Sequence, residues 1–150
     1  AWVYLGCLAF YPAYASERPF GVFDALAAGV TAGAIFIEWL SDRQLWRFRE
    51  ADTPPGAIMK TGLWKYSRHP NYLGEVGFWW GVFLMGLAAN PAKWWTLAGP
   101  VSITLLFVFI SIPMLDNRHL TRRPGYADHV KTTRSLLPVP RYCTRVKRSV

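Results

Sequence analysis

Two polar residues one helical turn apart, Asn71 and Glu75, are the strongest candidates for chemistry in this chain of 150 residues. Residues four apart lie on one face of a helix, and both stand at the start of an apolar stretch. A carboxylate at membrane depth is costly, so Glu75 should face protein or a water-filled cavity. It could grip a ligand or share a proton, or it could simply neutralise a nearby Arg. The position of Asn71 favours a functional role.

Basic residues come directly before this pair. Lys65, Arg68 and His69 form the densest cationic cluster ahead of a predicted helix start. Because a helix N-terminus favours anions, Arg68 and His69 would suit a phosphate or a carboxylate. Basic residues at a cytoplasmic membrane edge also set topology and contact anionic lipids without any further ligand. The cluster by itself therefore leaves both interpretations open.

Two further groups of charged residues bear on a possible site. Glu38 and Asp42 are four apart, so they repel unless a cation or a hydrogen-bonding ligand lies between them. Arg43, Arg47 or Arg49 could supply that cation, and solvation at the interface is the equal alternative for Glu38. After the last apolar segment comes a second basic group that could close a nucleotide site from the other end: Arg118, His119, Arg122 and Arg123.

Several kinds of site are not indicated. The chain has no GxGxxG, P-loop or GxSxG motif. Its three histidines, His69, His119 and His129, have no HExxH or similar spacing, so no metal site is predicted. The basic patches are flanked by apolar spans, which favours a lipid edge or a small anion over nucleic acid as their partner.

Composition indicates what must position these residues. Hydrophobic residues make up 52% of the chain and charged residues 17%, whereas a soluble domain is about a quarter charged. We predict an all-α, polytopic transmembrane bundle in a single membrane domain, with segments at 19–40, 72–89 and 93–115 and a partial one at 1–15. Because segment 1–15 is short, we expect the chain to be the C-terminal part of a longer protein. Gly29 and Gly33 predict a close helix contact.

The distribution of basic residues predicts how the chain is oriented in the membrane. Of the 17 Lys and Arg residues, six lie in the polar loop 41–71 and nine in the tail 116–150. Three crossings after residue 15 place the loop and the tail on one side of the membrane. The positive-inside rule then makes that side cytoplasmic, and a bacterial inner membrane is the expected location.

The stretch TGLWKYSRHPNYLGEVGFWWG (Thr61–Gly81) carries a resemblance to a known superfamily, together with the Glu38–Arg49 segment and the stretch RRPGYADHVKTTRSLLPVP. It resembles the C-terminal region of steroid 5-alpha-reductases, sterol reductases and their bacterial, DUF1295-like relatives of unassigned function. More distantly, it resembles isoprenylcysteine carboxyl methyltransferases. The resemblance implies a helical membrane enzyme with a cytoplasmic cofactor pocket.

The reductase branch of this superfamily uses NADPH, and the resemblance implies that Asn71 contacts this cofactor. Glu75 would hydrogen-bond the substrate carbonyl that conjugates with the reduced double bond, with Tyr72 in the same motif. Residues and resemblance together predict these cofactor-binding side chains: Asn71, Arg68, His69, Asp42, Arg49, Glu38, His119 and Arg118. The expected substrate is a lipophilic small molecule, either steroid-like or another enone.

Two other functions stay open. Arg68-His69-Pro70 is closer to the methyltransferase branch, in which that motif binds S-adenosylmethionine. The sulfonium of S-adenosylmethionine favours acids and aromatic faces, whereas NADPH carries several negative charges and suits the many basic residues here. The preferred prediction is therefore the NADPH-dependent reductase, with the methyltransferase as the alternative. A non-catalytic membrane scaffold is the third possibility.

Overall fold

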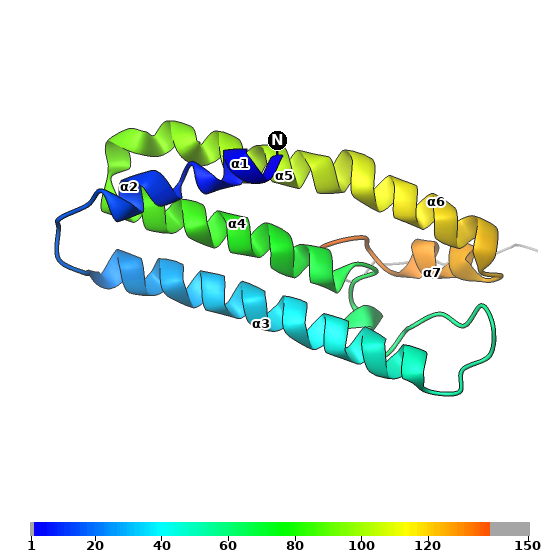
Figure 1. Ribbon diagram of the computed structural model, residues 1–150. Coiled ribbons are helices and arrows are strands. Elements are labelled where there is room, and N and C mark those ends of the chain that lie inside the picture. Colours follow the sequence, from blue (N-terminus) through cyan, green and yellow to red (C-terminus); the bar gives the residue numbers. More distant parts are fainter. Residues whose placement is uncertain (1, 139–150) are drawn as a thin grey trace, which may run out of the picture.

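The computed structural model describes residues 2–138 and is built from helices (Figure 1). In chain order these are α1 (Trp2–Cys7), α2 (Phe10–Tyr14), α3 (Val22–Glu50), η1 (Gly62–Lys65), α4 (Pro70–Ala89), η2 (Pro91–Leu97), α5 (Ala98–Leu106), η3 (Phe107–Ser111), α6 (Ile112–Arg122) and α7 (Tyr126–Thr132). The described part contains no strand, and its one extended pairing is a bridge between Ser67 and Arg134. The predicted all-α class is confirmed. Residues 139–150 of the predicted tail 116–150 lie outside the described residues.

Three helical segments are long and apolar enough to cross a membrane: Val22–Glu50, Pro70–Ala89 and Pro91–Arg122. They include the predicted spans 19–40, 72–89 and 93–115 almost entirely, and the chain is a membrane protein. Two of them extend further than these spans. α3 continues through the polar stretch to Glu50, and α6 continues to Arg122. The predicted loop 41–71 and tail 116–150 therefore both begin as helix.

The two long helices end at residues that cannot continue them. Ala51 has an extended backbone, and Pro54 and Pro55 follow within four residues. Arg123 is also extended, as expected for a residue before proline. Gly125 then adopts a φ of 84°, a left-handed conformation that glycine takes without strain. These turns place the ends of α3 and α6 at the same end of the molecule (Figure 1).

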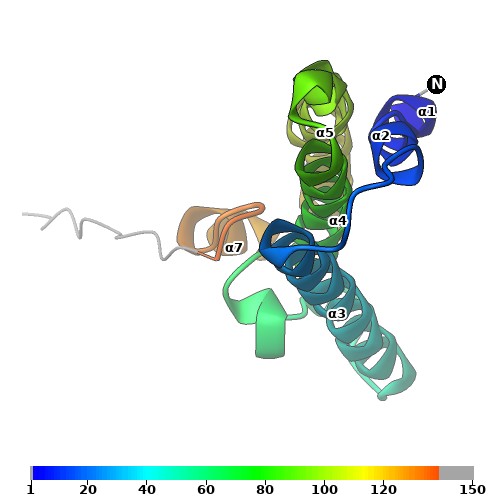
Figure 2. The ribbon, with the colours of Figure 1, turned by 90° about the vertical axis from the view of Figure 1, so that its left-hand side faces the viewer.

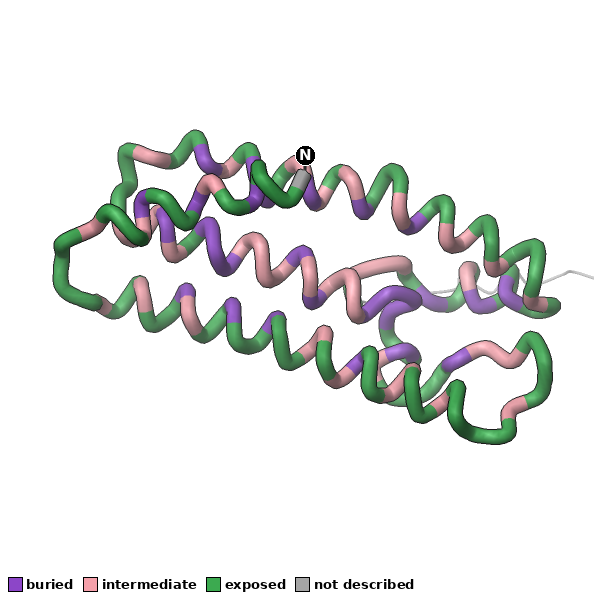
Figure 3. Tube along the Cα trace, in the orientation of Figure 1, coloured by how far each residue is buried: buried purple, intermediate pink, exposed green. Residues whose placement is uncertain are grey.

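α4 is the central helix of the bundle. α3 packs along its length, α2 packs against its second half, and α5 returns beside it after the turn at Asn90. Figure 2 shows α1 and α2 on one side of the α4–α5 pair and α7 on the other. Buried residues follow α4 and gather again at the end that carries α7 (Figure 3). This second gathering, at the polar end, is where the candidate site lies.

The predicted helix contact through Gly29 and Gly33 is wrong. A Cβ atom added at either position would meet nothing within 4 Å. The close contact is made by glycines of α4 instead. A Cβ at Gly74 would lie 2.7 Å from the Cβ of Glu38, and a Cβ at Gly81 would lie 2.9 Å from the Cα of Thr31. Small residues do allow α3 and α4 to approach closely, as expected in lipid, but these residues belong to α4 and not to α3.

The helical rod from Pro91 to Arg122 is irregular in two places. Its first part, η2, is a 3-10 helix in which Lys93 has a non-helical backbone (φ −91°, ψ 25°). η3 is a π-helical turn that comes directly before Pro113. Proline lacks the N–H that would bond to the carbonyl four residues earlier, and local π geometry is one way to accommodate this loss. The rod therefore continues across the proline and carries Asp116, Arg118 and His119 to the polar end.

We predict that Gly81→Ala destabilises the bundle, because the new methyl group would press on the backbone of Thr31. Overpacking of this kind costs about 1–3 kcal/mol. Thermal unfolding in detergent measures the change. Gly33→Ala is the matched control, since its Cβ meets open space. Equal effects of both substitutions would contradict the packing described here.

Candidate functional site

The loop before α4 is held by the segment after α7. The backbone N–H of Arg68 donates to the carbonyl of Arg134 at 2.9 Å, and that of His69 donates to the carbonyl of Ser135 at 3.0 Å. The Ser67 hydroxyl donates to the same Ser135 carbonyl at 3.0 Å. Residues 67–69 and 134–135, almost seventy positions apart in sequence, are therefore joined next to the start of α4.

The Arg68 side chain lies inside this junction. It is 5% exposed and contacts the Asp116 carboxylate through Nη2 at 2.7 Å. Its Nη1 donates to the carbonyls of Val130, at 3.3 Å, and Thr133. These carbonyls belong to the last turn of α7 and the residue after it, and such groups have no partner within their own helix. Arg68 therefore binds α6 and α7 to the loop before α4.

Asp116 accepts hydrogen bonds from three side chains. Besides Arg68, Nε2 of His69 lies 2.9 Å from Oδ1, and the Tyr126 hydroxyl donates to the same oxygen at 2.6 Å. Hydrogen bonds to an ionised carboxylate are short and strong. Burial, followed by the hydrogen bond to Asp116, raises the pKa of the Tyr126 hydroxyl, so this group remains a donor. A single carboxylate thus fixes three donors from two distant segments.

A cavity of about 370 Å³ opens beside this network, which is within the size range of small-molecule sites. Four parts of the chain line it. They are the end of α3 and the loop after it (Leu45, Arg49, Ile58, Met59), η1 and the start of α4 (Trp64, Arg68, His69, Asn71, Tyr72), α6 and its end (Leu115, Arg118, His119, Arg122, Arg123), and α7 (Tyr126, His129).

The cavity is strongly cationic. Five of the described residues that line it are arginines, and none is Asp or Glu. Arg68 is neutralised by Asp116. Within residues 2–138, no hydrogen bond or ion pair engages the other four guanidinium groups, which are those of Arg49, Arg118, Arg122 and Arg123. Like charges gathered without counter-charges favour binding of an anionic ligand.

His129 shows the effect of this environment. It is buried, and the Thr133 hydroxyl lies 3.3 Å from its Nδ1. Burial lowers the pKa of His129 to about 4, and the positive charges of Lys60 and Arg68 act in the same direction. The imidazole is therefore neutral at pH 7 in the folded protein.

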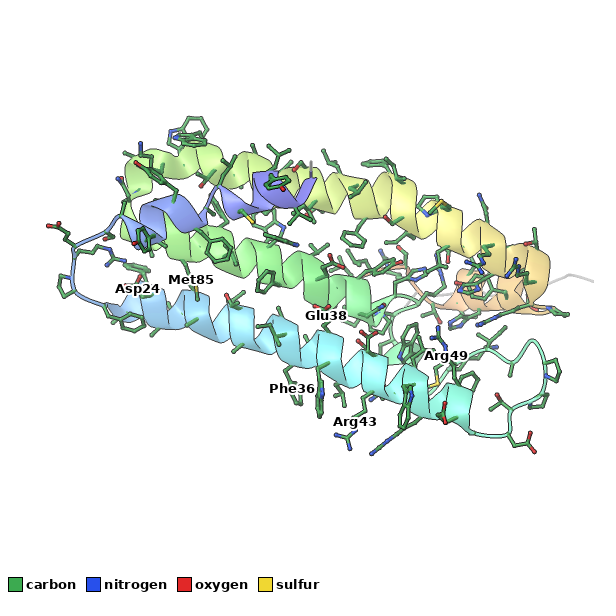
Figure 4. All side chains as sticks on the ribbon, in the orientation of Figure 1. Asp24, Phe36, Glu38, Arg43, Arg49 and Met85 are labelled. Atoms are coloured by element: carbon green, nitrogen blue, oxygen red, sulfur yellow. The ribbon has the colours of Figure 1, made fainter. Side chains whose placement is uncertain are left out.

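The structure brings most of the predicted cofactor residues to this cavity: Asn71, Arg68, His69, Arg49, His119 and Arg118 all line it, together with Tyr72. Glu38 and Asp42 do not. They line a separate open groove of about 510 Å³ on α3, with Trp39, Arg43 and Trp46. In Figure 4, Arg49 lies on the side of α3 that faces the polar-end loop, whereas Arg43 and Phe36 point away from α4.

Glu75 lines neither of these two sites. It is half-buried one turn deeper along α4 than Asn71, and it interacts electrostatically with Glu38 and Asp42 of α3. The described residues provide it with no cationic partner. Arg43, one of the cations proposed to separate Glu38 from Asp42, stacks on the Trp39 ring instead, at 5.1 Å from the ring centroid.

Sequence reasoning missed Asp116, the residue that organises the site. One feature of the sequence could have indicated Asp116: it is one of only two acidic residues in the basic tail 116–150. That feature alone is weak, because it does not say which basic residues the acid contacts. No group of His, Cys, Asp and Glu in the described part of the chain could hold a metal ion.

We predict that Asp116→Ala frees the segment after α7. Removing one partner of a buried ion pair costs about 3–5 kcal/mol, since the other charge is left unpaired. Limited trypsin digestion should then cleave at Arg134 much faster. Asp128→Ala is the control, because its ion pair with Lys131 is exposed and exposed pairs contribute at most about 1 kcal/mol. Equal cleavage of both variants would show that Asp116 does not hold the segment.

The pKa of His129 also predicts how stability depends on pH. Its pKa is about 4 when folded and about 6.5 when unfolded. Between these values the unfolded chain binds more protons, so stability falls as pH decreases from about 6.5 to 4. Thermal unfolding of His129→Gln should therefore change less over this interval than that of the unsubstituted protein. An identical pH dependence would contradict a neutral, buried His129.

Comparisons with known proteins identify the family of this chain. A family model described as "Protein of unknown function (DUF1295)" matches residues 1–133. An uncharacterized protein of Schizosaccharomyces pombe is 31% identical over 101 residues, which cover 55% of this chain and 29% of the yeast protein. The chain thus matches less than a third of that relative's length. No solved structure matches. The extent of the family match shows that the chain belongs to the DUF1295 family.

Proposed function

We propose that this protein is a membrane-embedded, NADPH-dependent reductase of a carbon–carbon double bond in a lipophilic, enone-like substrate. The observation that carries the proposal is the cavity with four unpaired arginines. NADPH presents a pyrophosphate and a further phosphate on its ribose, and guanidinium groups bind phosphates through paired, charge-assisted hydrogen bonds. The residues present therefore fit the cofactor. The resemblance to steroid 5-alpha-reductases and sterol reductases supports the same assignment.

The start of α4 gives this proposal its geometry. Asn71 lines the cavity with Arg68 and His69, and Glu75 follows one turn deeper in the apolar part of the bundle. NADPH bound there would supply hydride. Asn71 would help to hold the cofactor, and a lipophilic substrate would reach Glu75 from the bilayer. The cavity would open to the cytoplasm, as the distribution of basic residues predicts.

Glu75 would act on the substrate carbonyl. When it carries its proton, a carboxyl group donates a hydrogen bond. Such a donor stabilises the negative charge that develops on the carbonyl oxygen while hydride arrives at the β carbon. The apolar surroundings of α4 would exclude water from this contact and so strengthen it. Tyr72 lies beside Glu75 and would also contact the substrate.

A methyltransferase that uses S-adenosylmethionine is the second candidate, and one observation favours it. The groove on α3 combines two acids, Glu38 and Asp42, with two tryptophans, Trp39 and Trp46. A sulfonium cation prefers such surroundings. The groove is more open than the arginine cavity. We prefer the reductase because four of the arginines that line the cavity have no partners within the described residues.

Equilibrium titration of the purified protein separates these functions. The reductase proposal requires saturable binding of NADPH and much weaker binding of S-adenosylmethionine. The reverse order would establish the second candidate. Binding of neither would favour a non-catalytic scaffold, and it would overturn the reductase proposal.

Glu75→Gln tests the assigned role of the acid. We predict that turnover of an enone is lost, whereas NADPH binds as before, because Gln cannot supply the same acidic donor and Glu75 does not line the arginine cavity. Steady-state kinetics and a binding titration measure the two quantities. Loss of NADPH binding together with turnover would argue against the role assigned to Glu75.

Arg118→Ala tests the cavity. Loss of a charge-assisted hydrogen bond costs about 1.5–3 kcal/mol, so NADPH should bind roughly 10- to 100-fold more weakly. Arg43→Ala is the matched control on α3, since Arg43 stacks on Trp39 outside the cavity. If Arg43→Ala weakens NADPH binding and Arg118→Ala does not, the cofactor lies in the groove instead.

A further inference from the structure

The orientation of the His69 ring is set by Asp116. Asp116 accepts hydrogen bonds from Arg68 and from the Tyr126 hydroxyl, which indicates an ionised carboxylate. An ionised carboxylate can only accept a hydrogen bond, so the His69 nitrogen at 2.9 Å from it, Nε2, must carry a hydrogen. Whenever His69 is neutral, the proton is therefore on Nε2 and the lone pair is on Nδ1.

Nδ1 of His69 is the atom that remains free for the cavity. It has no hydrogen-bond partner in residues 2–138. Yet every fully buried side-chain nitrogen and oxygen in this part of the chain has a partner. Nδ1 must therefore keep some contact with open space, and the open space beside His69 is the cavity. The residue as a whole is only 2% exposed, so its contact with the cavity is confined to a small part of the ring.

Three further contacts hold the ring in place. The Tyr72 ring stacks on it with centroids 5.4 Å apart and planes 16° apart. The His69 backbone N–H donates to the Ser135 carbonyl at 3.0 Å and to the Ser67 hydroxyl at 3.2 Å. A surface histidine that only sets topology would need none of these contacts. The arrangement is that of an imidazole oriented by a carboxylate on one side and presented to a reacting atom on the other.

We propose that His69 is the proton donor of the reductase site and that Asp116 is its positioning residue. This inference rests on the proposed function. After hydride forms a C–H bond at the β carbon, the electron pair of the double bond moves into an enolate. The Nδ1–H of the His69 imidazolium then breaks, its proton forms the C–H bond at the α carbon, and the electron pair remains on the neutral imidazole. Solvent entering the cavity returns a proton to Nδ1.

The charges around His69 permit this role. On α6, Asp116 stabilises the imidazolium and His119 lies nearby. On α7, His129 is neutral and Tyr126 remains protonated. Arg68, the preceding residue, has its charge balanced by Asp116, and α4 contributes the uncharged Tyr72.

The first test needs no substrate. The chain has three histidines, so ¹⁵N-histidine labelling gives three imidazoles, and His→Gln variants assign them. At alkaline pH we expect His69 to carry its proton on Nε2, and this preference should be lost in Asp116→Asn. A neutral His69 with its proton on Nδ1 in the unsubstituted protein would overturn the proposal.

The second test uses NADPH with testosterone, 4-cholesten-3-one and 2-cyclohexen-1-one as enone probes. A positioned acid contributes roughly 10²- to 10⁴-fold to rate, so kcat of His69→Gly should fall by about that factor. NADPH affinity should change by much less. Added imidazole should restore part of the turnover, and it should restore none in Glu75→Gln, which lacks a different group. His69→Asn replaces His69→Gly if the glycine variant does not fold, and it should show the same fall in kcat.

The outcomes separate the two proposals. If the unsubstituted protein binds no NADPH and reduces none of the probes, the proposed function fails and this inference fails with it. If the unsubstituted protein is active and the His69 variants keep their kcat, only the role of His69 is overturned. A loss of kcat that comes with equal loss of NADPH affinity and no rescue by imidazole would show a purely structural role.

Discussion

The Asp116 carboxylate is the interaction on which the polar end of this protein depends. It is mostly buried, and it binds Arg68, His69 and Tyr126 at once. Two of these residues precede α4 and the third begins α7, so one side chain of α6 joins three elements. Without it, the Arg68 charge, the His69 ring and the Tyr126 hydroxyl would all lose their buried carboxylate partner, at a cost of several kcal/mol. The position of the loop that leads into α4 and Asn71 therefore depends on a residue 45 positions after Asn71 in the chain.

Helix packing supplies the second constraint. Gly74 and Gly81 let α4 approach α3 closely enough for backbone and Cβ atoms to touch. This close approach places Glu75 beside Glu38 and Asp42, and it separates an acidic groove on α3 from an arginine-lined cavity at the helix ends. The two surfaces have opposite charge. Their separation is what allows one face of the molecule to suit a phosphate-bearing cofactor while the other does not.

The sequence predicted the parts of this structure that local patterns determine. The apolar runs marked the spans, Asn90-Pro91 marked the turn between α4 and the following helices, and Asn71 and Glu75 fall on α4 as their spacing indicates. The end of α6 at Arg122 was not predicted, since polar residues continue a helix into water as readily as they form a loop. The close contact was placed at Gly29 and Gly33, because a stripe of small residues does not say which helix faces which.

The network around Asp116 could not be predicted from local pattern. It joins residues 67–69 to residues 116, 126 and 133–135, and nothing in the spacing of these residues brings them together. Arg68 and His69 were expected to meet a phosphate or a carboxylate. The carboxylate that they contact belongs to the protein, and their outer edges line the cavity. The proposed anion site therefore consists of Arg49, Arg118, Arg122 and Arg123, which only the fold brings together at one cavity.

The central claim is that the arginine cavity holds the phosphates of NADPH, and protection against arginine modification tests it most directly. The protein is treated with phenylglyoxal with and without NADPH, and the modified arginines are identified by mass spectrometry. The account predicts that NADPH protects Arg49, Arg118 and Arg122 while Arg43, on the outer groove, reacts equally in both samples. Protection of Arg43 alone, or of no arginine while NADPH is bound, would contradict it.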